Sequence, residues 1–202
     1  MNALIMTLQI TLCAAVLSTL IGTLAAIGIS AMKKRGTTLM LGATNIPLLN
    51  ADIVTGISLM LLFVKFLNLG FVTVLIAHIT FDIPYVILNV LPKLKQVNRN
   101  TYEAALDLGA SPLYAFYKVT WPDIKSGVFS GFLMAVTMSL DDFIITHFTK
   151  GAGINTLSTL IYSEVRRGIK PSMYALSTII FLAVLVLLLI TNFAPGRKKE
   201  EH

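Results

Sequence analysis

The chain has 202 residues, of which 55% are hydrophobic and only 13% charged, and its mean hydropathy is +0.79. Soluble domains usually carry about 25% charged residues, so this composition excludes an ordinary soluble protein and predicts an integral membrane protein. The single cysteine, Cys13, excludes an internal disulfide framework. The formal charge of +6 is interpreted as a topology signal, and no nucleic-acid partner is expected.

Long apolar segments follow one another along the chain. A hydrocarbon core about 30 Å thick needs roughly 20 helical residues, and helices satisfy their own backbone groups in lipid. We therefore predict an all-α membrane bundle in a single domain, residues 1–202, with five transmembrane helices. In chain order the predicted spans are approximately residues 3–32, 38–66, 69–91, 126–148 and 173–193. Pro47 interrupts the second span, and Asp52 is predicted to begin a helix there, where the helix dipole favours an acid.

The basic residues predict the orientation of these spans. If Lys33, Lys34 and Arg35 lie in the cytoplasm, so do the long loop 92–125 and the basic residues at 197–199. Most of the 16 lysines and arginines are then inside, as the positive-inside rule requires. The C-terminus is accordingly predicted to be cytoplasmic and Met1 external. A chain that begins outside the membrane needs a signal for its N-terminus to cross, and the first segment has no signal-peptide features. We therefore expect a further helix before Met1.

The long cytoplasmic loop is predicted to hold two short helices separated by Gly109, which tolerates the left-handed conformation that ends a helix. The first helix is predicted to begin with Asn100 as N-cap and Glu103 as its partner in a capping box. The second helix is predicted after an N-cap at Ser111 and runs to Val119.

The first of these helices has two distinct faces. Glu103 and Asp107 are four residues apart and share one face, while Ala104, Ala105 and Leu108 form a small apolar face beside it. Such a short helix is not stable alone, so it must pack on the bundle or dock on a partner. The alternative is a solvated connector lying on the membrane surface.

The stretch EAALDLGASPLYAFYKVTWP, residues 103–122, resembles the signature of permease subunits of ABC importers. That signature is E-A-A, three residues, G, nine residues, I, one residue and L-P. The positions that match are Glu103, Ala104, Ala105, Gly109 and Pro122. Val119 stands in place of Ile, and Trp121 stands in place of Leu. Residues 77–95, 138–151 and 157–181 extend the resemblance over essentially the whole chain, toward permeases of the spermidine/putrescine type.

The resemblance implies the type I importer permease (MetI-like) fold, with a coupling helix that docks on a cytoplasmic ABC ATPase subunit. The ATPase-coupling residues that it implies are Glu103, Ala104, Ala105, Asp107, Leu108 and Gly109. It further implies a second permease subunit, an extracytoplasmic polyamine-binding protein and contact with lipid in the bacterial cytoplasmic (inner) membrane. The sequence has no G-x-x-x-x-G-K-[ST] phosphate loop, so we expect a non-enzymatic chain without cofactor, with ATP and Mg²⁺ bound by the ATPase.

Acidic residues within the predicted spans are the candidate pathway residues. Charged groups are costly in the membrane and usually face a pathway or a partner. A polyamine is an extended polycation that needs acids for its ammonium groups and aromatic faces for cation–π contact. We therefore predict that Asp82, Tyr85, Asp141 and Asp142 line the substrate pathway. The alternative is that Asp141 or Asp142 pairs internally, for example with a helix N-terminus.

Two further interpretations stay open. Intramembrane acids also suit an ion-coupled secondary transporter of a small cationic solute, which uptake measurements would distinguish by its independence from ATP. His78 and His147 have no partners at metal-ligand spacing, so no metal site is expected and hydrogen bonding or packing is predicted for both.

Overall fold

The computed structural model describes residues 2–167, 175, 178, 181–182 and 185, and every regular element in that part of the chain is helical. Contacts divide the chain into two units, Met1–Leu160 and Ile161–His202. The elements are α1 (Asn2–Ala31), α2 (Lys34–Leu49), α3 (Asp52–Phe66), α4 (Phe71–Gln96), α5 (Arg99–Asp107), α6 (Pro112–Ala115), the π-helix η1 (Phe116–Thr120), α7 (Trp121–Asp141), α8 (Ile144–Thr149) and α9 (Leu157–Arg167).

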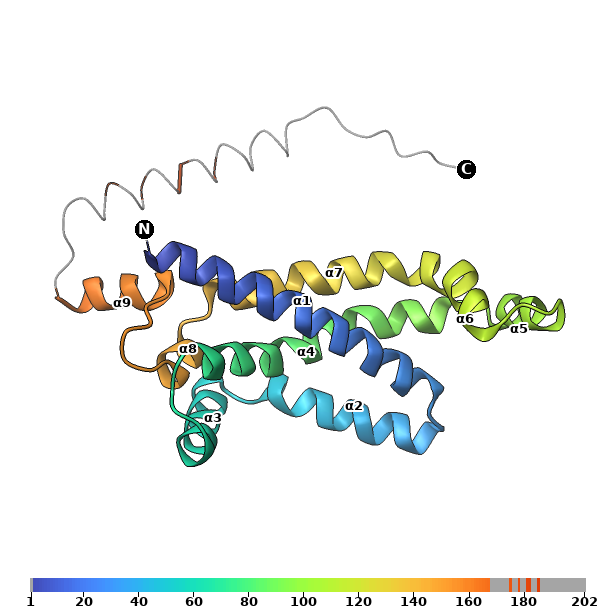
Figure 1. The fold of residues 1–202 in the computed structure, drawn as a ribbon, viewed down its shortest axis with the longest axis horizontal. Helices are drawn as coiled ribbons and strands as arrows, with labels where there is room; N and C mark the ends of the chain where they lie inside the picture. The colour runs from blue at the N-terminus through green and yellow to red at the C-terminus, as the bar shows by residue number, and fades with distance from the viewer. Residues whose placement is uncertain (1, 168–174, 176–177, 179–180, 183–184, 186–202) are drawn as a thin grey trace. The chain divides into compact units, whose positions relative to one another are not determined.

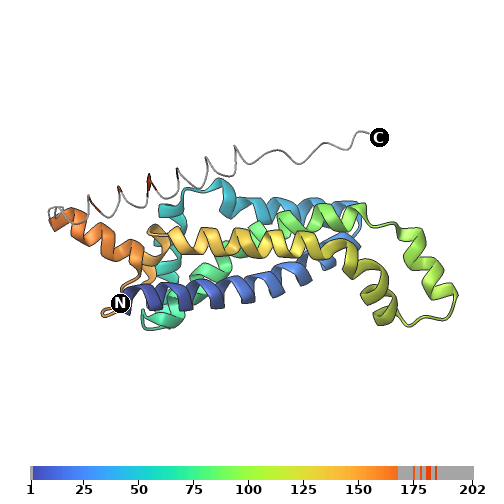
Figure 2. The same ribbon diagram turned by 90° about the horizontal axis from the view of Figure 1, so that it is seen from above.

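Three long helices, α1, α4 and α7, lie side by side and form the centre of the first unit (Figures 1 and 2). Small residues allow their backbones to approach closely, as is usual between membrane helices. A Cβ at Gly22 of α1 would lie 2.7 Å from the Val86 Cβ of α4, and one at Gly131 of α7 would lie 3.2 Å from the Val86 Cα. Ala15, Ala26 and Ala135 are fully buried in the apolar cluster around this contact.

The segment predicted as one span over residues 38–66 contains two helices. α2 and α3 meet at an angle of 102° with a break at residues 50–51. Pro47 lies inside α2, so the break follows the proline by three residues rather than falling on it. Asp52 occupies the first turn of α3, which confirms the predicted helix start.

The segment predicted as a span over residues 126–148 is also interrupted. α7 begins earlier, at Trp121, and ends at Asp141, after which α8 starts at Ile144. α8 packs against α3 and α4, where Phe63, Phe81 and Ile145 form a second apolar cluster.

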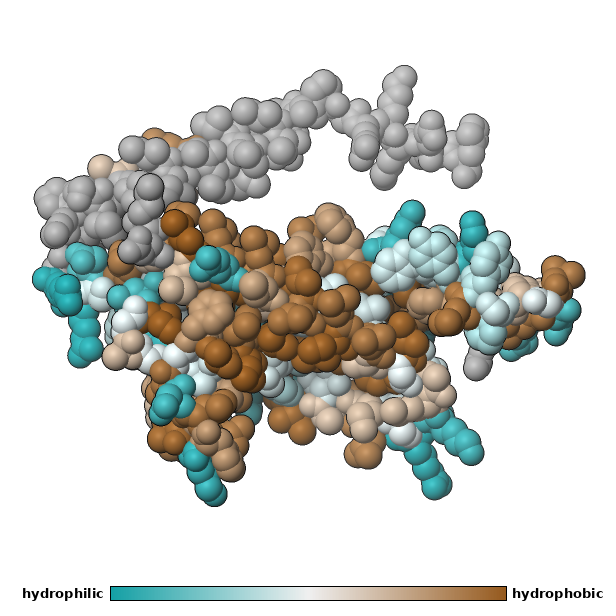
Figure 3. Space-filling view, in the orientation of Figure 1, coloured by the Kyte–Doolittle hydropathy of each residue, from teal (hydrophilic) through white to brown (hydrophobic). Residues whose placement is uncertain are grey.

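The apolar lengths of the described helices suit a membrane. Ala3–Ala31 and Phe71–Gln96 are long and apolar enough to cross one, and the bent pair α2–α3 is a third candidate. Figure 3 shows apolar side chains over the middle of the visible face, with hydrophilic ones gathered toward the helix ends. The predicted span 173–193 lies almost entirely outside the described residues, so the number of spans stays a prediction.

Candidate functional site

The first helix of the loop predicted to be cytoplasmic, α5, ends where the sequence predicted but begins at a different residue. Gly109 has a φ of 86°, the left-handed conformation predicted for the residue that stops this helix. The N-cap is Asn98 rather than Asn100, because the Asn98 side chain accepts a hydrogen bond of 3.0 Å from the Asn100 backbone N–H. The predicted capping box at Asn100 and Glu103 was therefore wrong by two residues, since two asparagines in one turn compete for the same role.

The second helix of the loop begins as predicted but does not end at Val119. The Ser111 side chain accepts a hydrogen bond from the Tyr114 backbone N–H at 3.4 Å, and Pro112 follows in the first turn. α6 then continues through η1 into α7 without an intervening loop. The wider π-helical turn lies immediately before Pro122, which has no N–H and would crowd the carbonyl of an ordinary α-helical turn.

Most of the predicted coupling residues are exposed on this loop. Glu103, Ala104, Asp107, Leu108 and Gly109 are exposed and Ala105 is half-buried. Leu108 is 89% exposed, and nearby Leu113 is 83% exposed. Large apolar side chains exposed in a group commonly mark a protein-binding surface.

Figures 1 and 2 place α5 and α6 at one end of the bundle, beyond the C-terminal end of α4. A cavity of about 520 Å³ at this end is lined by the end of α1, the start of α2, the end of α4, α5 and η1. The basic connection between α1 and α2, which contains Lys33, therefore lies toward the same end. Lys95 and Tyr102 are among the residues that line the cavity. The basic residues of the α1–α2 connection and of the end of α4 therefore share one end of the first unit, whereas residues 197–199 lie outside the described residues.

Asp82 lies midway along α4 and is fully buried at 0% exposure. Neither of its carboxylate oxygens has a hydrogen-bond partner among the described residues. A buried carboxylate is costly unless it is paired or neutralised, so Asp82 needs either a proton or a cationic partner that the described residues do not supply.

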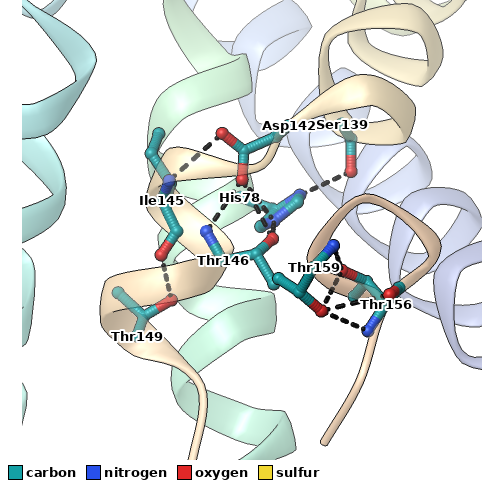
Figure 4. A network of polar contacts seen from close by, with 8 residues as sticks. All are labelled: His78, Ser139, Asp142, Ile145, Thr146, Thr149, Thr156 and Thr159. Atoms are coloured by element: carbon teal, nitrogen blue, oxygen red, sulfur yellow. Dashed lines mark hydrogen bonds and ion pairs between the residues drawn. The ribbon is translucent and has the colours of Figure 1, made fainter. Parts of the chain in front are cut away.

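A second buried acid, Asp142, belongs to a polar network around His78 (Figure 4). His78 is 3% exposed and forms hydrogen bonds through Nδ1 with the Ser139 hydroxyl at 2.6 Å and through Nε2 with the Thr146 hydroxyl at 2.9 Å. Its Nε2 also lies 3.5 Å from an Asp142 carboxylate oxygen. This confirms the hydrogen-bonding role predicted for His78.

The Asp142 carboxylate also caps α8. It accepts hydrogen bonds from the backbone N–H groups of Ile145 and Thr146 at 3.2 and 2.8 Å, and from the Thr146 hydroxyl at 2.9 Å. The internal pairing considered as an alternative is thus present for Asp142. Asp141, the last residue of α7, is exposed instead.

The fourth predicted pathway residue, Tyr85, is half-buried and lies one turn beyond Asp82 on α4. Its ring packs edge-on against Phe81, with a centroid separation of 5.4 Å. Asp82 and Tyr85 are thus near neighbours on α4, and Asp142 lies against the same helix through its contact with His78.

The fold agrees with what comparison with known proteins shows. A model of the family described as "Binding-protein-dependent transport system inner membrane component" matches residues 18–197. The chain belongs to this family. Membership confirms the resemblance predicted from residues 103–122 and makes the chain a multi-pass membrane component of a transport system.

Individual members of the family give a closer comparison. The putrescine transport system permease protein PotI of Escherichia coli (strain K12) is 36% identical over 210 residues, covering 100% of this chain and 75% of that protein. The spermidine/putrescine transport system permease protein PotC of Haemophilus influenzae is 35% identical over 202 residues, covering 100% of this chain and 78% of that protein. A crystal structure of an amino acid ABC transporter with histidines matches with a TM-score of 0.62 at 19% identity, covering 95% of this chain and 91% of that one. The last likeness supports the permease fold alone.

Sequence reasoning missed two parts of the site. The bonds of His78 to Ser139 and Thr146 join residues 61 and 68 positions apart, a separation at which no spacing rule applies. The bend of 102° between α2 and α3 was also missed, because Pro47 was its only local signal.

Proposed function

We propose that this chain is a transmembrane permease subunit of an ATP-driven ABC importer and that its substrates are putrescine and spermidine. The family and the similar permeases named for these solutes support the proposal. The structural observation that supports it most directly is Asp82, a carboxylate buried midway along a membrane-length helix with both oxygens unpartnered among the described residues.

The partners proposed for this chain follow from the loop that contains α5. Leu108 and Leu113 are exposed apolar side chains of the same loop as the exposed signature residues, and an ABC ATPase subunit would cover them. The ATPase would bind ATP and Mg²⁺, and its closure would move α5 as a rigid body against the bundle. A second permease subunit and an extracytoplasmic polyamine-binding protein complete the proposed importer. The basic residues at the α5 end support a cytoplasmic location for this loop, and hence for the C-terminus.

The acids near α4 suit a cationic solute. An ammonium group that enters the bundle loses its hydration, which is costly unless a carboxylate or an aromatic face replaces the water. Asp82 supplies the charge, and the neighbouring rings of Phe81 and Tyr85 supply the aromatic faces. Asp141 and Asp142 belong to the same proposed pathway, Asp141 as an exposed acid and Asp142 as a buried one held by His78.

The Asp82→Asn variant tests the proposed pathway, because the amide keeps the shape of the side chain and removes its charge. Uptake of labelled putrescine by proteoliposomes containing the assembled importer should fall at least about tenfold, with ATP required for uptake by the unchanged protein. Asp123→Asn, an exposed acid in the first turn of α7, is the matched control and should transport normally. Unchanged uptake by Asp82→Asn at normal expression would remove Asp82 from the pathway. Uptake that an uncoupler abolishes and that does not need ATP would favour a secondary transporter instead.

A further inference from the structure

The cavity of about 520 Å³ lies where the bundle meets the loop that contains α5. Its lining comes from the last turns of α1 and α4, from the start of α2, and from α5 and η1 of the loop. α1 and α4 include the two described segments that are each long and apolar enough to cross a membrane. Because the ends of such helices reach the boundary of the hydrocarbon core, the cavity lies at the depth of the lipid headgroups.

The lining of this cavity combines apolar surface with positive charge. Ile27, Leu94 and Phe116 supply apolar surface, while Lys95 and the Tyr102 hydroxyl are polar. The Lys95 side chain is exposed and forms no ion pair with any described residue. A lysine at a membrane boundary commonly lays its methylene groups along apolar surface and directs its ammonium group toward the headgroups. The cavity therefore offers an unpaired cation beside an apolar wall.

A surface groove beside the cavity adds further positive charge. The residues that line it are Lys34, Arg35, Thr38 and Leu39. Thr37 lines the cavity and Thr38 lines the groove, so the two hollows lie on adjacent sides of the first turns of α2. Figure 3 shows hydrophilic side chains projecting where α2 begins. Within the described part of the chain, neither Lys34 nor Arg35 forms an ion pair.

The acids at this end of the first unit do not neutralise these cations. Glu103 and Asp107 on α5 and Asp123 on α7 are exposed, and they line neither the cavity nor the groove. The charge that complements the two hollows is therefore negative and has to come from outside the described residues.

We infer that the cavity binds an anionic phospholipid of the leaflet on the α5 side of the membrane, with the headgroup phosphate at Lys95 and the start of the acyl chains against Ile27 and Leu94. Lys34 and Arg35 raise the positive potential beside the phosphate. A free phosphate ion would use the charge and leave the apolar lining uncovered, whereas a phospholipid at this depth satisfies both. The proposed function makes this leaflet the cytoplasmic one, but lipid binding does not depend on which solute is transported.

The first experiment uses Trp121, the single tryptophan of the chain, which directly follows Thr120 in the cavity lining. The full chain is reconstituted in bilayers, and quenching of its fluorescence by brominated phosphatidylglycerol is compared with quenching by brominated phosphatidylcholine. We expect a preference for phosphatidylglycerol of about fivefold, the factor expected from one basic residue near a membrane surface. Lys95→Gln should lower the preference to about twofold or less, and Lys95→Arg should keep it within about twofold of the unchanged protein.

Lys118→Gln is the matched control for Lys95→Gln. Lys118 is exposed in η1 between Phe116 and Thr120, which line the cavity, but it does not line the cavity itself. The control removes the same charge at the same end, so the preference should be retained. Equal losses in the two variants, no loss in Lys95→Gln, or no preference in the unchanged protein would overturn the inference.

Hydrogen exchange tests whether the lipid occupies this cavity. Tyr102 on α5 is part of the lining, so a filled cavity should slow exchange of the α5 backbone amides. Exchange should be about threefold slower in bilayers that contain phosphatidylglycerol than in pure phosphatidylcholine, and Lys95→Gln should remove the difference. Equal exchange of the unchanged protein in the two bilayers would place the lipid elsewhere and overturn the inference.

Two additions to the fluorescence measurement distinguish the lipid from other anionic occupants. Glycerol 3-phosphate has the headgroup phosphate without acyl chains and should leave the preference unchanged, whereas its loss would make a soluble phosphate the ligand. The ATPase subunit should also leave the preference unchanged, whereas its loss would assign Lys95 to the surface that the ATPase covers. Either loss would overturn the inference. Because no transport is measured, failure to take up putrescine or spermidine would overturn the proposed function alone.

Discussion

The loop containing α5 and the buried centre around α4 are built by opposite means. In the loop, the side-chain hydrogen bonds join near neighbours: Asn98 with Asn100, Ser111 with Tyr114, and the Tyr102 hydroxyl with the Pro112 carbonyl. In the centre, His78 bonds to residues 61 and 68 positions away, and Thr73 donates to the Thr149 carbonyl across 76 positions. The loop is therefore a locally specified surface, whereas the centre exists only when three helices are already packed together.

This difference separates the two tasks that an importer permease must perform. A surface that docks on a moving partner needs exposed residues and modest local stability, because its structure is completed by the partner. A pathway for a cation needs polar groups held at fixed positions in an apolar medium, which requires dense packing around them. Mutations in the centre should accordingly reduce stability and uptake together, whereas mutations in the loop should change local order with little effect on global stability.

The largest stability effect is expected for His78→Ala. The substitution removes two buried hydrogen bonds and the contact with the Asp142 carboxylate, and it leaves a cavity between α4, α7 and α8. We expect the free energy of unfolding in detergent to fall by about 2–4 kcal/mol. His147→Ala is the matched control, because His147 is exposed and packs against the rings of Phe143 and Phe148, so the expected loss is about 1 kcal/mol or less. Equal losses in the two variants would show that the network does not stabilise the centre.

Close helix packing gives the next largest effect. A methyl group at Gly22 would lie within 2.8 Å of the Val86 side chain, so Gly22→Ala should cost about 1–3 kcal/mol in the same unfolding measurement. Gly28, on the same helix, has nothing within 4 Å of an added Cβ, and Gly28→Ala should be neutral or stabilise α1 by up to about 1 kcal/mol.

The double variant Gly22→Ala with Val86→Ala sharpens this test. If steric overlap causes the loss, the second substitution should recover part of it, and a double-mutant cycle should show a favourable coupling. Strictly additive losses would mean that the helices adjust elsewhere and that the contact is not tight.

The sequence predicted the loop and the long helices better than it predicted the breaks. Predicted spans 3–32 and 69–91 correspond to Asn2–Ala31 and Phe71–Gln96, because an unbroken apolar segment determines a helix in lipid by itself. Pro47 signalled a disturbance but not the bend of 102° that follows it. The π-helical turn before Pro122 was missed, since its wider hydrogen-bonding pattern leaves no periodic signal in five residues.

The candidate site shows the same difference: features determined by neighbouring residues were predicted, and features that depend on helix packing were not. The positions of the predicted coupling residues follow from a motif whose parts lie within one short loop. Asp82 was predicted from the cost of a charge in the membrane, and its burial agrees with that reasoning. What the sequence could not supply was the polar network beside Asp82 on α4, because the contacts of His78 with Ser139, Thr146 and Asp142 depend on how α4, α7 and α8 pack.

The smallest effect is expected at the start of α5, where two asparagines compete as N-cap. Asn98 accepts the hydrogen bond, so Asn98→Ala should destabilise α5 by about 1 kcal/mol, whereas Asn100→Ala should cost about 0.5 kcal/mol or less. Because α5 is a short exposed helix, the global unfolding free energy should barely change, and hydrogen exchange of the α5 backbone amides is the appropriate measurement. Exchange should accelerate about fivefold in Asn98→Ala and by less than about twofold in Asn100→Ala. Faster exchange in Asn100→Ala than in Asn98→Ala would instead support Asn100 as the N-cap, as predicted from the sequence. A large fall in the global unfolding free energy of either variant would mean that the loop and the centre do not fold as separately as their contacts indicate.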